Sequence, residues 1–84
     1  MGLTKGHIIW ESVTVLLKER IFLFCFGEKC MSGKISNIVK LDSLNEFEIE
    51  VEFIEPDYFA DELTPGNSFT IREASKVLGV GKIK

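Results

Sequence analysis

The sequence predicts an all-β protein, a small closed or partly open antiparallel β-barrel of about six strands. Three observations predict this fold. The chain has 84 residues, which is the size of a single domain, so we expect one domain over residues 1–84. Its apolar residues fall in short runs that are separated by turn-forming residues. One run, residues 47–53, alternates strictly between apolar and charged side chains, as a half-buried strand does.

The first two expected strands lie in residues 7–17 and 21–26. The Val and Thr content of residues 7–17 favours a strand. Because Glu11 interrupts the alternation, an amphipathic helix is the competing interpretation of this segment. Residues 17–20 predict a polar turn. Residues 21–26 carry an aromatic side chain at every second position, which predicts a buried strand.

The middle of the chain predicts a turn-rich connection followed by two strands. Residues 27–33 form the connection, and residues 35–39 are expected to be a short strand. The next strand is the clearest in the chain, because its apolar residues alternate with Glu48, Glu50 and Glu52. These carboxylates are expected to face water, where they repel one another unless cations of a neighbouring strand lie opposite them.

The last third predicts two more strands joined by a tight turn. A proline ends the preceding strand, and residues 57–67 form an acidic loop and a Pro-Gly turn. Strands are expected over residues 68–73 and 77–83. Gly79 and Gly81 share one parity of the last strand, which indicates a bend or a close approach of another backbone.

The net charge of −3 argues against a strongly basic nucleic-acid-binding protein. The charge is unevenly distributed. Residues 1–40 carry six Lys or Arg and three Glu, whereas residues 41–84 carry four Lys or Arg and ten Asp or Glu. Local basic patches are compatible with this balance. One comprises Lys18 and Arg20, and the other comprises Arg72, Lys76, Lys82 and Lys84.

No constellation of residues indicates an enzyme, a cofactor or a metal site. His7 is the only histidine and has no evident acidic partner, so a Ser-His-Asp or Cys-His mechanism is not expected. The segment Gly79–Lys82 superficially resembles a phosphate-binding loop. However, Lys76 stands where the first glycine belongs, and Ile83 stands where Ser or Thr belongs. We therefore expect a non-catalytic protein without a cofactor.

Cys25 and Cys30 are expected to be reduced thiols. Cys25 lies in an apolar run, which predicts a buried thiol, and Cys30 lies in a polar turn. A disulfide between them requires that the two side chains face each other. The polar start of the chain predicts no secretion signal, and the longest apolar run of six residues is too short to cross a membrane. We therefore expect a cytoplasmic protein, in which thiols stay reduced.

The last third of the chain resembles the end of elongation factor Tu. The resemblance rests on residues 51–56, the acidic loop, the run Phe-Thr-Ile-Arg-Glu at 69–73 and the run Val-Leu-Gly-Val-Gly at 77–81. In that family the C-terminal β-barrel domain closes with a Pro-ended strand, a loop, a Phe-x-Ile-Arg-Glu strand, a tight turn and a Val-Gly-x-Gly strand. The match covers residues 47–83 and implies a stand-alone barrel of this type, without a GTPase domain.

The resemblance also implies a ligand and a site. In the family, the turn after Arg-Glu lies near the T stem of aminoacyl-tRNA. The matching residues here are Arg72, Glu73 and Lys76, with Ala74 and Ser75 in place of the family's two glycines. The resemblance therefore implies a binding module that docks on RNA or on a protein of the translation apparatus.

The alternative is a self-associating protein with no nucleic-acid ligand. Nine of the 84 residues are aromatic, and Trp10, Tyr58 and Phe59 lie outside the clearest strands. Exposed aromatic residues on a small barrel are commonly covered in a homodimer.

Overall fold

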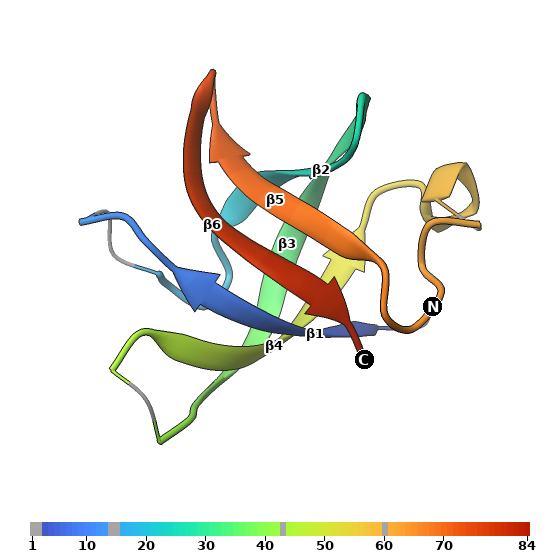
Figure 1. The fold of residues 1–84 in the computed structure, drawn as a ribbon. Coiled ribbons are helices and arrows are strands. Elements are labelled where there is room, and N and C mark those ends of the chain that lie inside the picture. The colour runs from blue at the N-terminus through green and yellow to red at the C-terminus, as the bar shows by residue number, and fades with distance from the viewer. Residues whose placement is uncertain (1–2, 14–15, 43, 60) are drawn as a thin grey trace.

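Six antiparallel strands close into one β-barrel, which confirms the predicted fold class. The computed structural model describes residues 3–13, 16–42, 44–59 and 61–84. The strands are β1 (Thr4–Trp10), β2 (Ile21–Phe26), β3 (Lys29–Lys40), β4 (Glu46–Phe53), β5 (Ser68–Glu73) and β6 (Lys76–Ile83), and one 3-10 helix, η1 (Pro56–Phe59), lies between β4 and β5. Their order around the barrel is β1-β4-β3-β2-β5-β6, and β6 pairs with β1 to close it (Figure 1).

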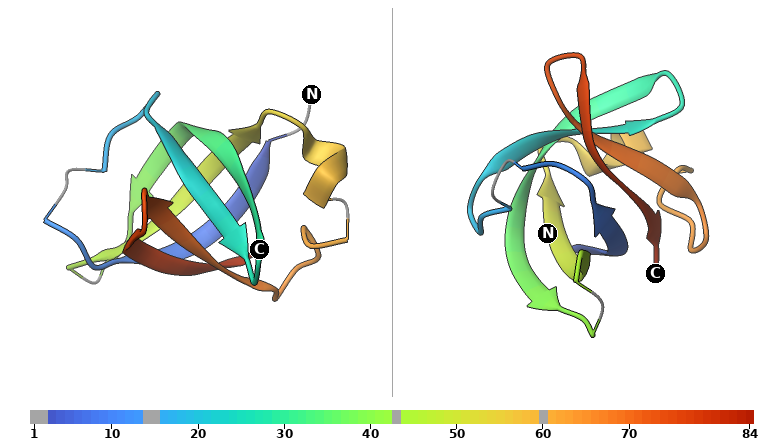
Figure 2. Two further views of the ribbon diagram at one scale, coloured as in Figure 1. Left: turned by 90° about the horizontal axis from the view of Figure 1, so that it is seen from above. Right: turned by 60° about the vertical axis from the view of Figure 1, so that its left-hand side comes forward.

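Three hairpins and two longer connections link the strands. The hairpins are β2–β3, β3–β4 and β5–β6. The longer connections, residues 11–20 and 54–67, lie at opposite ends of the barrel (Figure 2). Since strand direction alternates, the β5–β6 turn at Ala74 and Ser75 lies at the same end as residues 11–20. No helix in the described part of the chain is long and apolar enough to span a membrane.

The interior of the barrel is filled by side chains that alternate with the outward-facing ones. Phe24 lies at its centre, with ring centroids 5.4 Å from Phe53 and 5.8 Å from Phe69. Edge-on aromatic contacts of this kind add to the burial of apolar area. The buried cluster comprises Ile8, Trp10, Phe22, Phe24, Phe26, Ile35, Ile49, Val51, Phe53, Phe69, Ile71, Leu78 and Ile83.

The two glycines of β6 allow the closing strand to pack tightly against β1, as predicted. A Cβ atom at Gly79 would lie 2.8 Å from the carbonyl oxygen of Ile9. At Gly81 it would lie 2.8 Å from the carbonyl oxygen of His7 and 2.6 Å from Cγ2 of Ile8. A side chain at either position would therefore separate the two strands that close the barrel.

Two strand boundaries in the first half differ from the prediction. The first strand ends at Trp10, not at residue 17. Glu11, which interrupts the apolar alternation, still donates its backbone N–H to the carbonyl oxygen of Leu78 (2.8 Å), and the chain leaves the sheet after it. Thr14 and Val15 lie outside the described residues. The expected connection over residues 27–33 is mostly strand, since only Gly27 and Glu28 form the turn and β3 has 12 residues. The polar residues of β3 lie on the barrel surface. For this reason the sequence of residues 27–33 predicts a turn and not a strand.

The glutamates of β4 face cations of neighbouring segments. Lys5 of β1 lies 3.9 Å from Glu50, and Lys34 of β3 lies 3.9 Å from Glu52. Lys84 pairs with Glu48. These contacts relieve the repulsion along the strand, although exposed ion pairs each contribute little to stability.

Candidate functional site

A groove of about 340 Å³ crosses the outer surface of β2, β5 and β6. It is lined by Cys25, Gly27, Ser68, Phe69, Thr70, Arg72, Val80, Gly81 and Lys82. None of these lining residues is acidic. In a chain of net charge −3, this is a local reversal of the overall charge.

The pleat of β5 positions the polar side chains of the groove. Phe69 and Ile71 point into the core, so Ser68, Thr70 and Arg72 share the outer face. On the neighbouring strand, Lys82 lies directly opposite Ser68. The groove therefore has Ser68 and Lys82 toward one end, Thr70 in its middle and Arg72 toward the other end.

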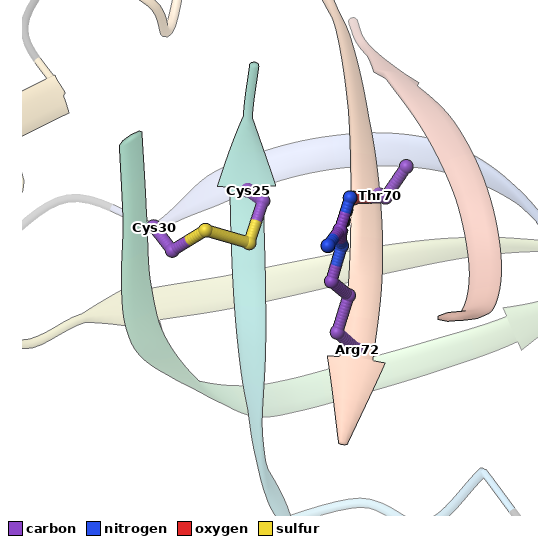
Figure 3. The surroundings of a disulfide bond; sticks show 4 residues. All are labelled: Cys25, Cys30, Thr70 and Arg72. Carbon is purple, nitrogen blue, oxygen red and sulfur yellow. Dashed lines mark hydrogen bonds between the residues drawn. A yellow bond between two sulfur atoms is a disulfide. The ribbon is translucent and has the colours of Figure 1, made fainter. Parts of the chain in front are cut away.

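Arg72 is held over the groove by a contact within its own strand. Its Nε donates a hydrogen bond to Oγ1 of Thr70, at 3.1 Å. Figure 3 shows the Arg72 side chain lying along β5, with its guanidinium beside Thr70. Since this bond uses only Nε–H, the two terminal nitrogens of the guanidinium keep their donors for a ligand.

The basic residues divide into those with ion pairs and those without. Lys5, Arg20, Lys29, Lys34 and Lys84 each lie within 4.0 Å of a glutamate oxygen. Among the described residues, Arg72, Lys76 and Lys82 of the β5–β6 hairpin form no such pair. The hairpin thus carries three positive charges that are available to an external anion.

The three predicted site residues lie on this hairpin but have different surroundings. Arg72 lines the groove. Lys76 is exposed at the start of β6, directly opposite Glu73. Glu73 pairs with Arg20 at 2.7 Å, so its carboxylate is occupied by the connection between β1 and β2. Glu73 therefore fixes the end of the barrel rather than facing the groove.

Lys82 was predicted to share a basic patch with Arg72, whereas Ser68 and Thr70 were not predicted as members of this site. The signal for the two hydroxyl residues was their shared parity with Arg72 along the strand. Lys82 was grouped with Lys84 in a basic patch, but the structure separates them, because Lys84 pairs with Glu48 whereas Lys82 lines the groove.

The two cysteines form a disulfide, so the expectation of reduced thiols is wrong for this structure. The two-residue turn at Gly27 and Glu28 places Cys25 directly opposite Cys30 in the β2–β3 hairpin, with their Cα atoms 4.0 Å apart. Cys30 lies in a strand, not in a turn. Figure 3 shows the bond joining β3 to β2, beside the strand that carries Thr70 and Arg72.

His7 has an acidic partner that the sequence did not reveal. Its Nε2 lies 3.0 Å from Oε1 of Glu46, 39 residues away in the chain. The pair lies on β1 and β4 and takes no part in the lining of the groove. Within the described residues, no group of three or more His, Cys, Asp or Glu side chains has an arrangement that would hold a metal ion.

A second groove, of about 280 Å³, lies on β2, β3 and β4 and includes the ion pair of Lys34 and Glu52. It also includes Ile21 and Ile54, which are 59% and 70% exposed. Two of the three aromatic residues that were expected at a self-association surface, Trp10 and Tyr58, do not line this second groove. Trp10 is buried in the core, and Tyr58 is half exposed beneath the ammonium group of Lys29. The side chain of Phe59 lies outside the described residues.

No protein-family model matches the chain, and no curated protein matches it in sequence.

Proposed function

We propose that the chain is a non-catalytic, RNA-binding module of the translation apparatus, built on a barrel like the C-terminal domain of elongation factor Tu. One observation carries the RNA-binding part. Within the described part of the chain, Arg72, Lys76 and Lys82 of the β5–β6 hairpin have no ion-pair partner, and two of them line a groove that has no acidic residue.

Phosphate groups suit this surface. Lysine and arginine side chains neutralise phosphates and release their counterions, which supplies much of the affinity for a nucleic acid. The guanidinium of Arg72 offers paired donors to phosphate oxygens. The hydroxyl groups of Ser68 and Thr70 are further donors of the kind that proteins direct at phosphates. Because these contacts are made to the RNA backbone, we expect the affinity to depend only weakly on the base sequence.

The absence of acid–base groups from the groove supports a non-catalytic role. None of the residues that line the groove is a histidine or a carboxylate, and the His7–Glu46 pair lies on other strands. A general acid or base must lie within hydrogen-bonding reach of the reacting group. The groove provides binding groups without that machinery.

The link to translation rests on the resemblance of residues 47–83. The segment that carries the Phe-x-Ile-Arg-Glu run is β5, and the two glycines of the following run lie in β6 against β1. Both features support a shared barrel design. A module of this type works in the cytoplasm, where disulfides are normally reduced, so the state of the Cys25–Cys30 pair bears on its activity.

The experiment that tests this function is an RNA titration followed by fluorescence anisotropy. With three phosphate contacts, we expect the logarithm of the RNA association constant to fall with the logarithm of the salt concentration. The slope should be about −2 for single-stranded RNA. The double variant Arg72→Gln/Lys82→Gln should bind more weakly, with a slope of about −0.7. The matched control is Lys5→Gln/Lys34→Gln, which removes two charges that already pair with glutamates. Equal loss in both variants would contradict the proposal.

Self-association is a second candidate, favoured only by the exposed isoleucines of the second groove. Ile21 and Ile54 are exposed in the same hollow, and exposed apolar surfaces commonly mark contacts between chains. If this candidate holds, sedimentation at high protein concentration gives a dimer, and Ile54→Glu restores the monomer.

A further inference from the structure

The two residues of the Cys25–Cys30 disulfide differ sharply in exposure. Cys25 is 1% exposed, whereas Cys30 is exposed on β3. Cys25 also lines the basic groove. In the sheet, Cys25 pairs with Cys30 of β3 on one side and with Thr70 of β5 on the other. It therefore lies between its disulfide partner and the strand that carries Arg72.

We propose that this pair is a thiol–disulfide exchange site, that low-molecular-weight thiols react at Cys30, and that the state of the pair sets the shape of the basic groove. This inference rests on the proposed function only for its biological consequence. The exchange and the change in the groove stand on the position of the two cysteines.

The exchange follows from which sulfur an external thiolate can reach. The thiolate attacks the exposed Sγ of Cys30, the S–S bond breaks, and Cys25 leaves as a thiolate that takes up the proton lost by the incoming thiol. A second thiol molecule attacks the mixed disulfide and releases Cys30. Overall, two external thiols become one small disulfide, and the protein gains two electrons and two protons. The reverse reaction uses a small disulfide as the oxidant.

The coupling to the groove follows from the direction of the Cys25 side chain. In the disulfide, its sulfur is bonded toward β3 and so is held away from β5 (Figure 3). After reduction the side chain regains its other staggered positions. Because Thr70 is the cross-strand neighbour of Cys25, one of these positions turns the thiol toward the Thr70 hydroxyl and the guanidinium that it holds. The reduced form therefore has a narrower groove and disturbs the Arg72–Thr70 contact.

The reaction site is tested by mixing the oxidised protein with reduced glutathione and mapping the mixed disulfide by mass spectrometry. We expect the adduct on Cys30 alone. In Cys30→Ser, the remaining Cys25 thiol should react with an aromatic disulfide reagent at least tenfold more slowly than the Cys30 thiol of Cys25→Ala. An adduct mainly on Cys25, or equal rates in the two variants, would overturn the assignment.

The effect on the groove is tested by NMR on the oxidised protein, the reduced protein and Cys30→Ser. This variant changes only the exposed cysteine, so the buried side of the hairpin is retained. We expect the Arg72 Nε–H and Thr70 amide signals to shift on reduction and in Cys30→Ser, while those of Lys5 and Glu50 on the opposite side stay in place. Unchanged Arg72 and Thr70 signals would overturn the coupling.

RNA affinity then separates this inference from the proposed function. We expect reduction to weaken RNA binding at least threefold. If the Arg72 and Thr70 signals shift but neither form binds RNA, the proposed function is wrong and the exchange site stands. If both forms bind RNA equally well, the exchange does not control the groove.

Discussion

Arg72 donates a hydrogen bond to the side chain of Thr70, which lies two residues earlier on the same face of β5 (3.1 Å). This contact turns a flexible surface arginine back along its strand, toward the hydroxyl groups of the groove. A side chain held in place loses less conformational entropy when it binds a ligand. The Thr70 hydroxyl therefore acts by positioning Arg72 as well as by contacting a ligand itself.

Replacing Thr70 with valine tests this positioning. Thr70→Val keeps the shape of the side chain but removes the acceptor of the Arg72 bond. We expect RNA affinity to fall two- to tenfold, as the loss of about one hydrogen bond implies. The measurement is an anisotropy titration, with Asn37→Val at an exposed position of β3 as the control for a valine on the barrel surface. Equal affinities of Thr70→Val and the wild type would show that the contact is incidental.

Lys76 and Glu73 are directly opposite each other in the hairpin but should respond differently to substitution. Lys76→Ala should weaken binding equally for all RNA sequences and reduce the salt slope by about 0.7. Glu73→Ala should leave the affinity unchanged or slightly raised, because its carboxylate pairs with Arg20 and repels phosphate. A large loss of affinity in Glu73→Ala would contradict this division of roles.

A methyl group at Gly81 should open the contact between β1 and β6. The new Cβ atom in Gly81→Ala would lie 2.8 Å from the backbone oxygen of His7, which moves only if the strand moves. Overpacking of this kind costs about 1–3 kcal/mol of unfolding free energy. Gly6→Ala is the matched comparison, because its nearest neighbour is a side-chain atom of Phe69 at 3.1 Å. Urea denaturation should show the smaller loss for Gly6→Ala, and the opposite order would be inconsistent with the packing described.

The Lys84–Glu48 pair predicts an acid-dependent contribution to stability. The hydrogen bond from Lys84, and then its positive charge, lower the pKa of Glu48 from its ordinary value. A lowered pKa in the folded state means that the ion pair contributes to folding stability at pH values above the ordinary pKa of about 4.3. It is lost as the pH falls through the lowered value.

Thermal unfolding of Lys84→Gln at different pH values tests whether this stability is lost in acid. The variant should be less stable than the wild type at neutral pH, and the difference should vanish as the pH falls through the lowered pKa of Glu48. In its NMR titration, the pKa of Glu48 should return toward the ordinary value. Lys82→Gln is the control, since Lys82 forms no ion pair among the described residues and should give no pH-dependent difference. A Lys84→Gln deficit that persists in acid would assign the effect to something other than the charge of Glu48.

Local patterns in the sequence predicted the elements that depend on neighbouring residues. The alternation around Glu48 and Glu50 identified β4, and the two glycines identified the tight contact of β6. The extent of β3 was not predicted, because the outer face of a barrel strand is polar and its pairing with β2 and β4 decides where it ends.

The site depends on register, which a sequence pattern does not reveal. Lys82 lies opposite Ser68 because of the β5–β6 pairing, which includes an irregularity between Ile71 and Arg72. The Cys25–Cys30 contact depends on a turn of only two residues. Likewise, the His7–Glu46 contact joins β1 to β4, which are distant in the chain. Arg72 and Lys82 could be grouped from sequence as basic residues, but the hydroxyl groups of Ser68 and Thr70 beside them could not.

The most direct test of the central claim is an NMR titration of the isotope-labelled protein with a short single-stranded RNA. We expect the largest shifts on Ser68, Thr70, Arg72 and Lys82, the polar lining of the groove. At the same RNA concentration, we expect smaller shifts in the Arg72→Gln/Lys82→Gln variant, which binds more weakly. Shifts concentrated instead around Ile21 and Ile54, or no shifts at all, would contradict the assignment of the basic groove as the RNA-binding site.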